Sequence, residues 1–140
     1  MILLDTNVIS ETFKPHPDGG VSEWLRSRPL ETWIVSSISK AELLYGVTIM
    51  PEGKRRKDLA RVIDAFFANW IVNPIYAFGD DEAIEYARIS AHRRRIGRPI
   101  RELDAQIAAI AAAGGFSLAT RNVRDFEGCG VKIVNPWEGK

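Results

Sequence analysis

The sequence predicts one α/β domain of three layers, in which a central, mostly parallel β-sheet is flanked by helices. Short apolar segments of strand length alternate along the chain with longer segments of helical period. Parallel neighbours in a sheet need crossover connections, and helices placed between strands supply them. A chain of 140 residues suffices for one ordinary core and leaves no room for a second. We therefore treat residues 1–140 as a single domain.

The N-terminal part begins with a strand and a helix. Residues 2–4 are apolar, and residues 6–13 follow with helical period. The turn-forming residues at 14–20 predict a loop, which leads into a short amphipathic helix at 21–26. A second apolar strand is predicted at 33–36.

Two helices are predicted after the second strand. Ser39 stands three residues before Glu42, which is the spacing of a capping box, and it predicts the start of a helix that runs to about Met50. Pro51 follows and ends it. Residues 54–70 predict a long surface helix, because apolar residues recur there at spacings of three and four.

The C-terminal part predicts two more helices and up to three strands. Residues 71–76 are a weaker strand candidate, because a proline lies inside them. Asp80 or Asp81 is expected to cap a helix that ends near Gly97. The remaining elements follow from their apolar patterns: a helix at 103–113 and strands at 116–120 and 131–134.

Composition favours a cytoplasmic protein without a membrane anchor. Nineteen basic and eighteen acidic residues leave a net charge of +1, so no overall field attracts nucleic acid or a membrane. The single Cys129 cannot form an internal disulfide, which fits a reducing compartment. The apolar run at 107–113 is far shorter than the ~18 residues of a membrane span.

Acidic side chains occur where a site is expected in such a fold. In open α/β sheets, ligands bind outside the carboxyl ends of the strands. Asp5 directly follows the first strand, and Asn122 and Asp125 follow the strand predicted before them. Glu42 and Asp104 lie near the N-termini of two predicted helices. We expect Asp5, Glu42 and Asp104 to converge.

Three converging carboxylates need a positive partner. Each close pair repels by roughly 4 kcal/mol at ~4 Å and an effective dielectric near 20. Protonation or an arginine offsets such repulsion, but a hard divalent cation suits an all-oxygen cluster best, and Mg²⁺ or Mn²⁺ is the natural candidate. Such a cation activates water and stabilises the departing oxygen of a phosphodiester. The cluster therefore predicts phosphodiester hydrolysis.

Most of these acids also have a structural interpretation. Glu42 completes a capping box if Ser39 begins the helix. Asp104 complements the dipole of its helix, and Asp125 fits a turn. Asp5 is the hardest to explain structurally, because an acid at the end of a buried strand is poor strand chemistry.

Several segments, in order along the chain, resemble one family. Residues 3–10 read LLDTNVIS and resemble the opening of the PIN-domain ribonucleases, specifically bacterial toxins of the VapC and FitB type. Residues 39–43 and 104–109 are similar to the second and third acidic motifs of that family. Residues 120–126 and 134–137 resemble its closing segment. The resemblance spans the chain from Ile2 to Trp137.

The resemblance implies a PIN-like fold and the endoribonuclease toxin of a type II toxin–antitoxin pair. Asp5 and Asp104 map onto the metal-binding acids, with Glu42 as the third acid of a pocket that binds Mg²⁺ or Mn²⁺. A metal-bound water would attack the RNA phosphorus, positioned by Asn122 and Thr120. Many relatives carry a fourth acid where this chain has Asn122, which leaves the number of bound metals open. The family further implies inhibition by a cognate VapB- or FitA-like antitoxin.

Basic and apolar segments suggest further contacts. Lys54-Arg55-Arg56-Lys57 would suit a phosphate or an acidic partner. A cluster of arginines before Asp104 is interpreted either as a site for RNA phosphates or as a solvated helix end. The apolar helix at 43–50 and the pair Phe66-Phe67 predict a homodimer. The cluster comprises six arginines within fourteen residues: Arg88, Arg93, Arg94, Arg95, Arg98 and Arg101.

Two rival functions are considered. Haloacid-dehalogenase-like phosphatases also place an Asp after the first strand, but they need a second Asp two residues later, where this chain has Asn7. The other rival is a catalytically weak PIN-fold binding module, which acts in a repressor complex and reaches DNA only through the antitoxin. Asn122 gives this alternative some support.

Overall fold

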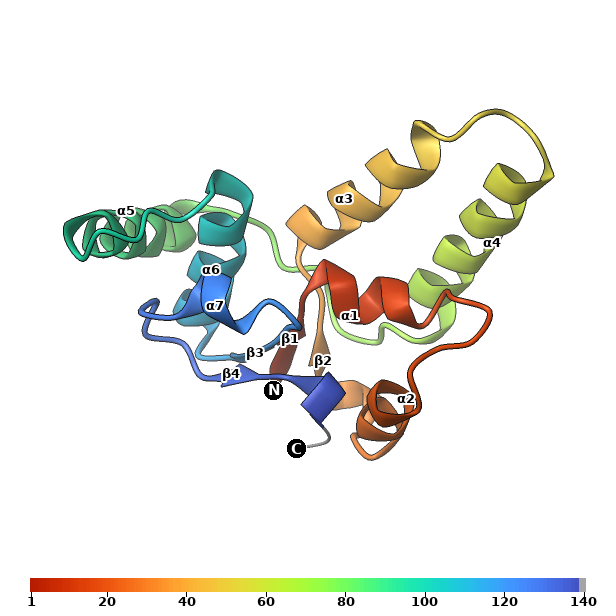
Figure 1. Cartoon of the computed structure of the whole chain (residues 1–140), viewed down its shortest axis with the longest axis horizontal. Helices are drawn as coiled ribbons and strands as arrows, with labels where there is room; N and C mark the ends of the chain where they lie inside the picture. The colour runs from red at the N-terminus through yellow and green to blue at the C-terminus, as the bar shows by residue number, and fades with distance from the viewer. Residues whose placement is uncertain (139–140) are drawn as a thin grey trace.

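The computed structural model describes residues 1–138 and confirms the predicted parallel sheet between helical layers. Figure 1 shows helices α5, α6 and α7 on one side of the strands and helices α1 and α2 on the other. Every strand pair is parallel, and the order in the sheet is β2-β1-β3-β4. The strands are β1 (Ile2–Leu4), β2 (Trp33–Ile34), β3 (Ser117–Ala119) and β4 (Ile133–Val134).

The first half of the chain contributes four of the helices. Helix α1 (Thr6–Glu11) follows β1, and α2 (Gly19–Arg26) begins after Asp18, whose carboxylate accepts a hydrogen bond from the Val21 amide at 3.1 Å. Helices α3 (Ser37–Thr48) and α4 (Lys54–Asn69) form a hairpin that projects away from the sheet (Figure 1).

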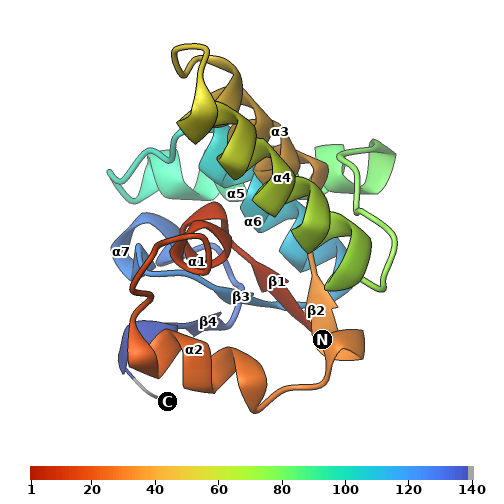
Figure 2. The ribbon, with the colours of Figure 1, turned by 90° about the vertical axis from the view of Figure 1, so that its right-hand side faces the viewer.

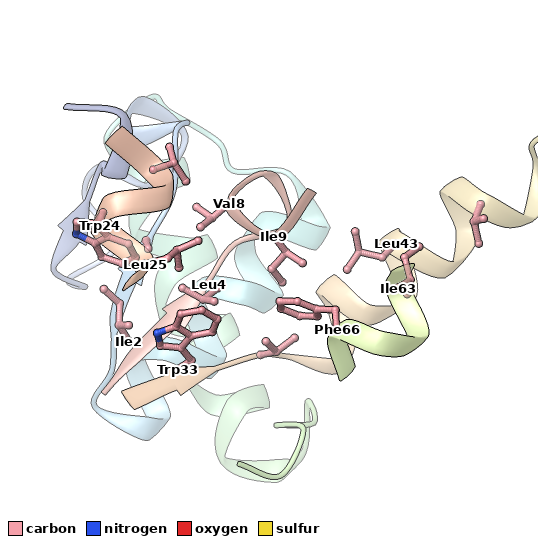
Figure 3. Close-up of a cluster of buried hydrophobic side chains, with 14 residues drawn as sticks. Ile2, Leu4, Val8, Ile9, Trp24, Leu25, Trp33, Leu43, Ile63 and Phe66 are labelled. Atoms are coloured by element: carbon pink, nitrogen blue, oxygen red, sulfur yellow. The ribbon is translucent and has the colours of Figure 1, made fainter. Parts of the chain in front are cut away.

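The alternation of side chains along the strands produces a core on each face of the sheet. Ile2 and Leu4 of β1 point to one face, where they pack with residues of α1, α2 and α4 (Figure 3). Leu3 between them points to the opposite face, beneath α5 (Asp80–Arg95) and α6 (Glu102–Gly114). Successive residues of a strand face opposite ways, so a strand buried on both faces is apolar throughout.

Two sequence predictions, one about a helix start and one about a strand, are wrong. Helix α3 begins at Ser37, and Ser36 is its N-cap, accepting from the Ser39 amide at 3.1 Å; Ser39 and Glu42 form no capping box. Residues 71–76 form no strand, and only Tyr76 pairs with Ser36 in an isolated bridge. Other boundaries agree to within two residues.

Helix α5 also begins differently from the prediction. Gly79 is its N-cap, while Asp80 and Asp81 lie in its first turn. The Glu82 carboxylate accepts from the Gly79 amide at 3.0 Å, so the third helical residue closes this end. Within residues 1–138, no helix is both long enough and apolar enough to cross a membrane.

Candidate active site

The candidate site lies at the carboxyl ends of the two central strands. Asp5 comes directly after β1, and Thr120 comes directly after β3. The backbone amide of Asp5 donates to the Ala119 carbonyl at 2.9 Å, so the β1–β3 ladder continues up to the site. Strand pairing therefore fixes the distance between Asp5 and Thr120.

The Asp5 carboxylate is buried, with 6% of the residue exposed. Its Oδ1 atom accepts from the Thr6 amide at 2.8 Å, and its Oδ2 atom accepts from the Thr120 hydroxyl at 2.7 Å. The Asn7 side-chain amide lies 3.3 Å from Oδ2. All three donors are neutral, so they orient this carboxylate without compensating its charge.

The surroundings of Asp5 disfavour its ionised form. Burial is the main cause and raises its pKa from 3.8 to about 6. The hydrogen bonds from Thr120 and Thr6 oppose this rise, whereas the negative charges of Asp104 and Glu42 add to it. A cation bound beside Asp5 would therefore stabilise its ionised form at neutral pH.

Glu42 reaches the same region from helix α3. Its Oε1 atom accepts a hydrogen bond from the Thr6 hydroxyl at 2.8 Å, and that hydroxyl lies 3.0 Å from Ser39 Oγ. Thr6 thus connects two acids, because its amide binds Asp5 while its hydroxyl binds Glu42. The side chain of Glu42 is free of a helix-capping role.

Asp104 lies in the first turn of α6 and is partly buried, with 18% of its side chain exposed. Burial raises its pKa; the Arg101 guanidinium, with Nε 3.8 Å from Oδ2, opposes the rise. The negative charges of Asp125 and Glu42 raise this pKa further. The charge of Asp104 also raises the pKa of Asp5, so the three acids share one electrostatic environment.

The three acids do not form a ready-made metal cage. Among residues 1–138, no three His, Cys, Asp or Glu side chains are placed together so that they could hold a metal ion. The chemistry of the donors nevertheless fits Mg²⁺ or Mn²⁺, because all are hard carboxylate oxygens. The excess negative charge around Asp5 also favours binding of a divalent cation.

Comparison with known proteins identifies the family. The sequence matches the PIN domain model over residues 2–128. The chain belongs to the PIN-domain family. Plasmid stability protein StbB of Pseudomonas syringae pv. tomato is 41% identical over 138 residues, covering 99% of both chains. VapC ribonuclease Y4jK of Sinorhizobium fredii is 40% identical over 138 residues, with the same coverage. The solved structure of FitAB bound to the IR36 DNA fragment matches with a TM-score of 0.92 and 36% identity, covering 98% of this chain and 96% of that chain.

The family match excludes the phosphatase alternative. A second aspartate two residues after Asp5 is absent from this PIN domain, and the position is held by Asn7. Asn7 forms structural contacts instead. Its amide nitrogen lies 3.3 Å from Asp5 Oδ2, and its carbonyl oxygen accepts from the Arg121 amide at 3.3 Å. Asn7 therefore connects the end of β1 to the segment after β3.

Thr120 and Asn122 occupy different positions in this PIN domain. The Thr120 hydroxyl is buried, donates to Asp5 and accepts from the Asn122 amide at 3.0 Å. Asn122 itself is exposed and is the N-cap residue of the short helix α7 (Val123–Phe126). Asp125 is exposed in the same helix, and its charge acts on Asp104. The structure thus places a fourth acid near the site.

The arginine cluster of this PIN domain is not one phosphate-binding surface. Arg93 is buried; it donates to the carbonyls of Arg98 at 2.6 Å and Asp125 at 2.7 Å. Arg98 pairs with Glu127 at 3.0 Å, on the same C-terminal segment. The RNA-phosphate interpretation is therefore wrong for Arg93, which binds the backbone of helix α7, the helix that carries Asp125.

Sequence analysis missed three polar residues of the site. Thr6 and Asn7 both bind Asp5, and Ser39 lies beside Thr6. The available signal was three polar residues in succession at the end of a buried strand, which a helix start alone does not require. Ser39 was assigned to a cap, although it is fully buried.

Proposed function

We propose that this chain, as a single PIN domain, is a divalent-metal-dependent endoribonuclease and the toxin of a type II toxin–antitoxin pair. One observation carries the proposal. The buried Asp5 carboxylate has only neutral hydrogen-bond donors, while Glu42 and Asp104 add negative charge around it. The similarity to VapC ribonuclease Y4jK supports the choice of RNA as substrate.

Asp5, Glu42 and Asp104 would hold Mg²⁺ or Mn²⁺. When bound, such a cation supplies an activated water for attack on phosphorus and stabilises the leaving oxygen. The remaining work falls to the chain itself. Thr120 and Thr6 orient both oxygens of Asp5, and the Thr6 hydroxyl orients Glu42. Asn122 and Thr120 would position the attacking water.

The test is cleavage of total RNA by purified protein with Mg²⁺ or Mn²⁺, and again with EDTA. Asp5→Asn should remain folded and lose metal-dependent cleavage. Asp18→Asn is a matched control, because Asp18 is an aspartate N-cap remote from the acids and asparagine caps helices equally well. Cleavage that survives EDTA, or that persists in Asp5→Asn, would refute the proposal.

We propose an antitoxin and a second copy of the chain as partners, and a cytoplasmic location. The solved structure of FitAB bound to a DNA fragment supports an antitoxin partner, and this chain would reach DNA only through that partner. The homodimer prediction is supported by apolar residues that helix α3 leaves exposed: Leu44, Tyr45 and Ile49. Tyr45 is 67% exposed, so burying it between two copies would remove apolar surface from water.

The dimer proposal has its own test. Tyr45→Lys should convert the protein to a monomer in light scattering coupled to gel filtration. Lys57→Ala, which changes an exposed residue of α4 instead, should leave the dimer intact. A wild-type chain that is monomeric at high concentration would contradict the proposal.

A catalytically weak binding module is the second candidate function. Asn122 in place of an acid and the absence of a ready-made metal cage among residues 1–138 favour it. The two functions differ in a Mn²⁺ titration followed by calorimetry. A nuclease should bind Mn²⁺ through Asp5, whereas a binding module should form its partner complex without any Mn²⁺ affinity.

A further inference from the structure

A cavity of about 510 Å³ adjoins the acids, and nothing described so far uses it. It lies between α1 and the α3–α4 hairpin. Thr6 and Glu42 belong both to its wall and to the candidate active site. The rest of its wall is mostly apolar and comes from three helices and the segment that follows α1: Phe13, Leu43, Gly46, Val47, Leu59 and Ile63. Figure 3 shows Leu43 and Ile63 lying side by side where α3 meets α4.

Gly46 lies in the lining of this cavity and is exposed. It lies one turn after Glu42 on the same face of α3, because residues four apart in a helix are neighbours. A Cβ atom added at Gly46 would meet no atom within 4 Å. Glycine destabilises a helix relative to alanine, and no close packing requires it here. The residue therefore leaves space that a larger side chain would fill.

The cavity has the chemical features of a nucleotide site. Its lining includes Glu42, one of the three acids, so a phosphodiester bound at the acids would lie beside it. The lining is largely apolar, and it includes Phe13, a half-buried ring that packs edge-to-face with Phe66 and offers an aromatic surface to a base. Lys14 lies at the cavity with 57% of its side chain exposed, bridged to Glu11 at 2.8 Å, and adds a cation near the rim.

We propose that this cavity, the nucleobase subsite, binds the base of the nucleotide next to the scissile phosphate. The inference rests on the proposed nuclease function and adds a specificity-determining position, Gly46, to it. A ribonucleotide is favoured over a peptide because the cavity shares Glu42 and Thr6 with the phosphate-processing acids. A base is joined to that phosphate through a single ribose, so it would lie in the cavity beside the acids.

The test uses Gly46→Leu, Gly46→Ala and the matched control Gly19→Leu. A Cβ atom at Gly19 also meets nothing within 4 Å, and Gly19 lies outside the cavity. The probes are the 5′- and 3′-monophosphates of the four ribonucleosides, with ribose 5-phosphate as the baseless reference. Binding is measured by calorimetry in the presence of Mn²⁺, alongside the affinity for Mn²⁺ alone.

Wild-type protein should bind at least one nucleotide more tightly than ribose 5-phosphate. Gly46→Leu should weaken that nucleotide by about 5- to 150-fold, the range given by loss of one base stack, while its affinities for Mn²⁺ and ribose 5-phosphate stay unchanged. Gly46→Ala should have an intermediate effect and a higher melting temperature, which shows that the fold is intact. Gly19→Leu should match the wild type.

Three results would overturn the subsite. They are equal binding of nucleotides and ribose 5-phosphate by the wild type, unchanged nucleotide binding by Gly46→Leu, and a parallel loss of Mn²⁺ affinity in Gly46→Leu. Loss of a co-purifying antitoxin with nucleotide binding unchanged would assign the cavity to a peptide instead. RNA cleavage is measured in parallel. RNA cleavage without base selectivity would refute only the subsite proposal. Base-selective binding without RNA cleavage would refute only the proposed nuclease function.

Discussion

Replacing Asp5 with Asn should stabilise the metal-free protein at neutral pH but not in acid. The folded-state pKa of Asp5 is about 6, against 3.8 without the surroundings of the fold. Below about pH 4 the carboxyl is protonated in both states, so it costs nothing. Between about pH 4 and pH 6 the unfolded chain loses this proton while the folded protein keeps it, so stability falls over that interval and levels off above it.

The magnitude follows from the shift. A shift of roughly two pKa units means that ionised Asp5 destabilises the fold by about 3 kcal/mol at pH 7.5. Asn avoids this cost, but its imperfect hydrogen bond takes back about 1 kcal/mol of the gain. We therefore expect Asp5→Asn to raise the free energy of unfolding by about 1–3 kcal/mol at pH 7.5. At roughly 3 °C per kcal/mol, the melting temperature should rise by about 3–9 °C.

The assay is thermal unfolding in EDTA from pH 4 to pH 8, followed by circular dichroism. Asp18→Asn should shift little across this range, which controls for loss of an aspartate as such. A difference between Asp5→Asn and wild type that does not grow with pH would refute the reasoning. Adding Mn²⁺ at pH 7.5 should then stabilise the wild type and not Asp5→Asn.

Three further predictions follow from the contacts of the site. Thr6→Val keeps the amide bond to Asp5 but removes the hydroxyl from Glu42, so cleavage should fall at least tenfold with the melting temperature nearly unchanged; equal loss in Thr6→Ser, which retains a hydroxyl, would contradict this role. Arg93→Met leaves the Asp125 and Arg98 carbonyls without their donor and should cost about 2–4 kcal/mol in urea unfolding; a cost below about 1 kcal/mol would show that those bonds are dispensable. Asn122→Asp adds a carboxylate beside the site and should tighten Mn²⁺ binding in calorimetry, and unchanged affinity would place residue 122 outside the metal's reach.

The fold was predictable because burial on both faces of the sheet leaves a clear pattern. Ile2, Leu3 and Leu4 form a continuous apolar run, as a strand between two cores requires. Asp5 was predictable for the same reason, since a charged residue ends that run, although the structure shows that it also caps helix α1. The carboxyl-edge position then followed from parallel topology alone.

Other parts depend on contacts between segments remote in the sequence. Ser39 and Glu42 have capping-box spacing, and only the structure shows that Ser36 caps the helix while Thr6 receives Glu42. Arg93 belongs to a run of arginines that looks solvated, yet the C-terminal segment covers it. Spacing along one helix carries no information about such partners.

The hydrogen bond between Thr120 and Asp5 joins residues 115 positions apart. A chain still being synthesised therefore has no assembled acid centre until β3 has emerged from the ribosome and paired with β1. Nearly the whole polypeptide must therefore exist before the site can assemble. A chain that ends anywhere upstream of β3 lacks Thr120, and its Asp5 carboxylate loses the hydroxyl that orients it.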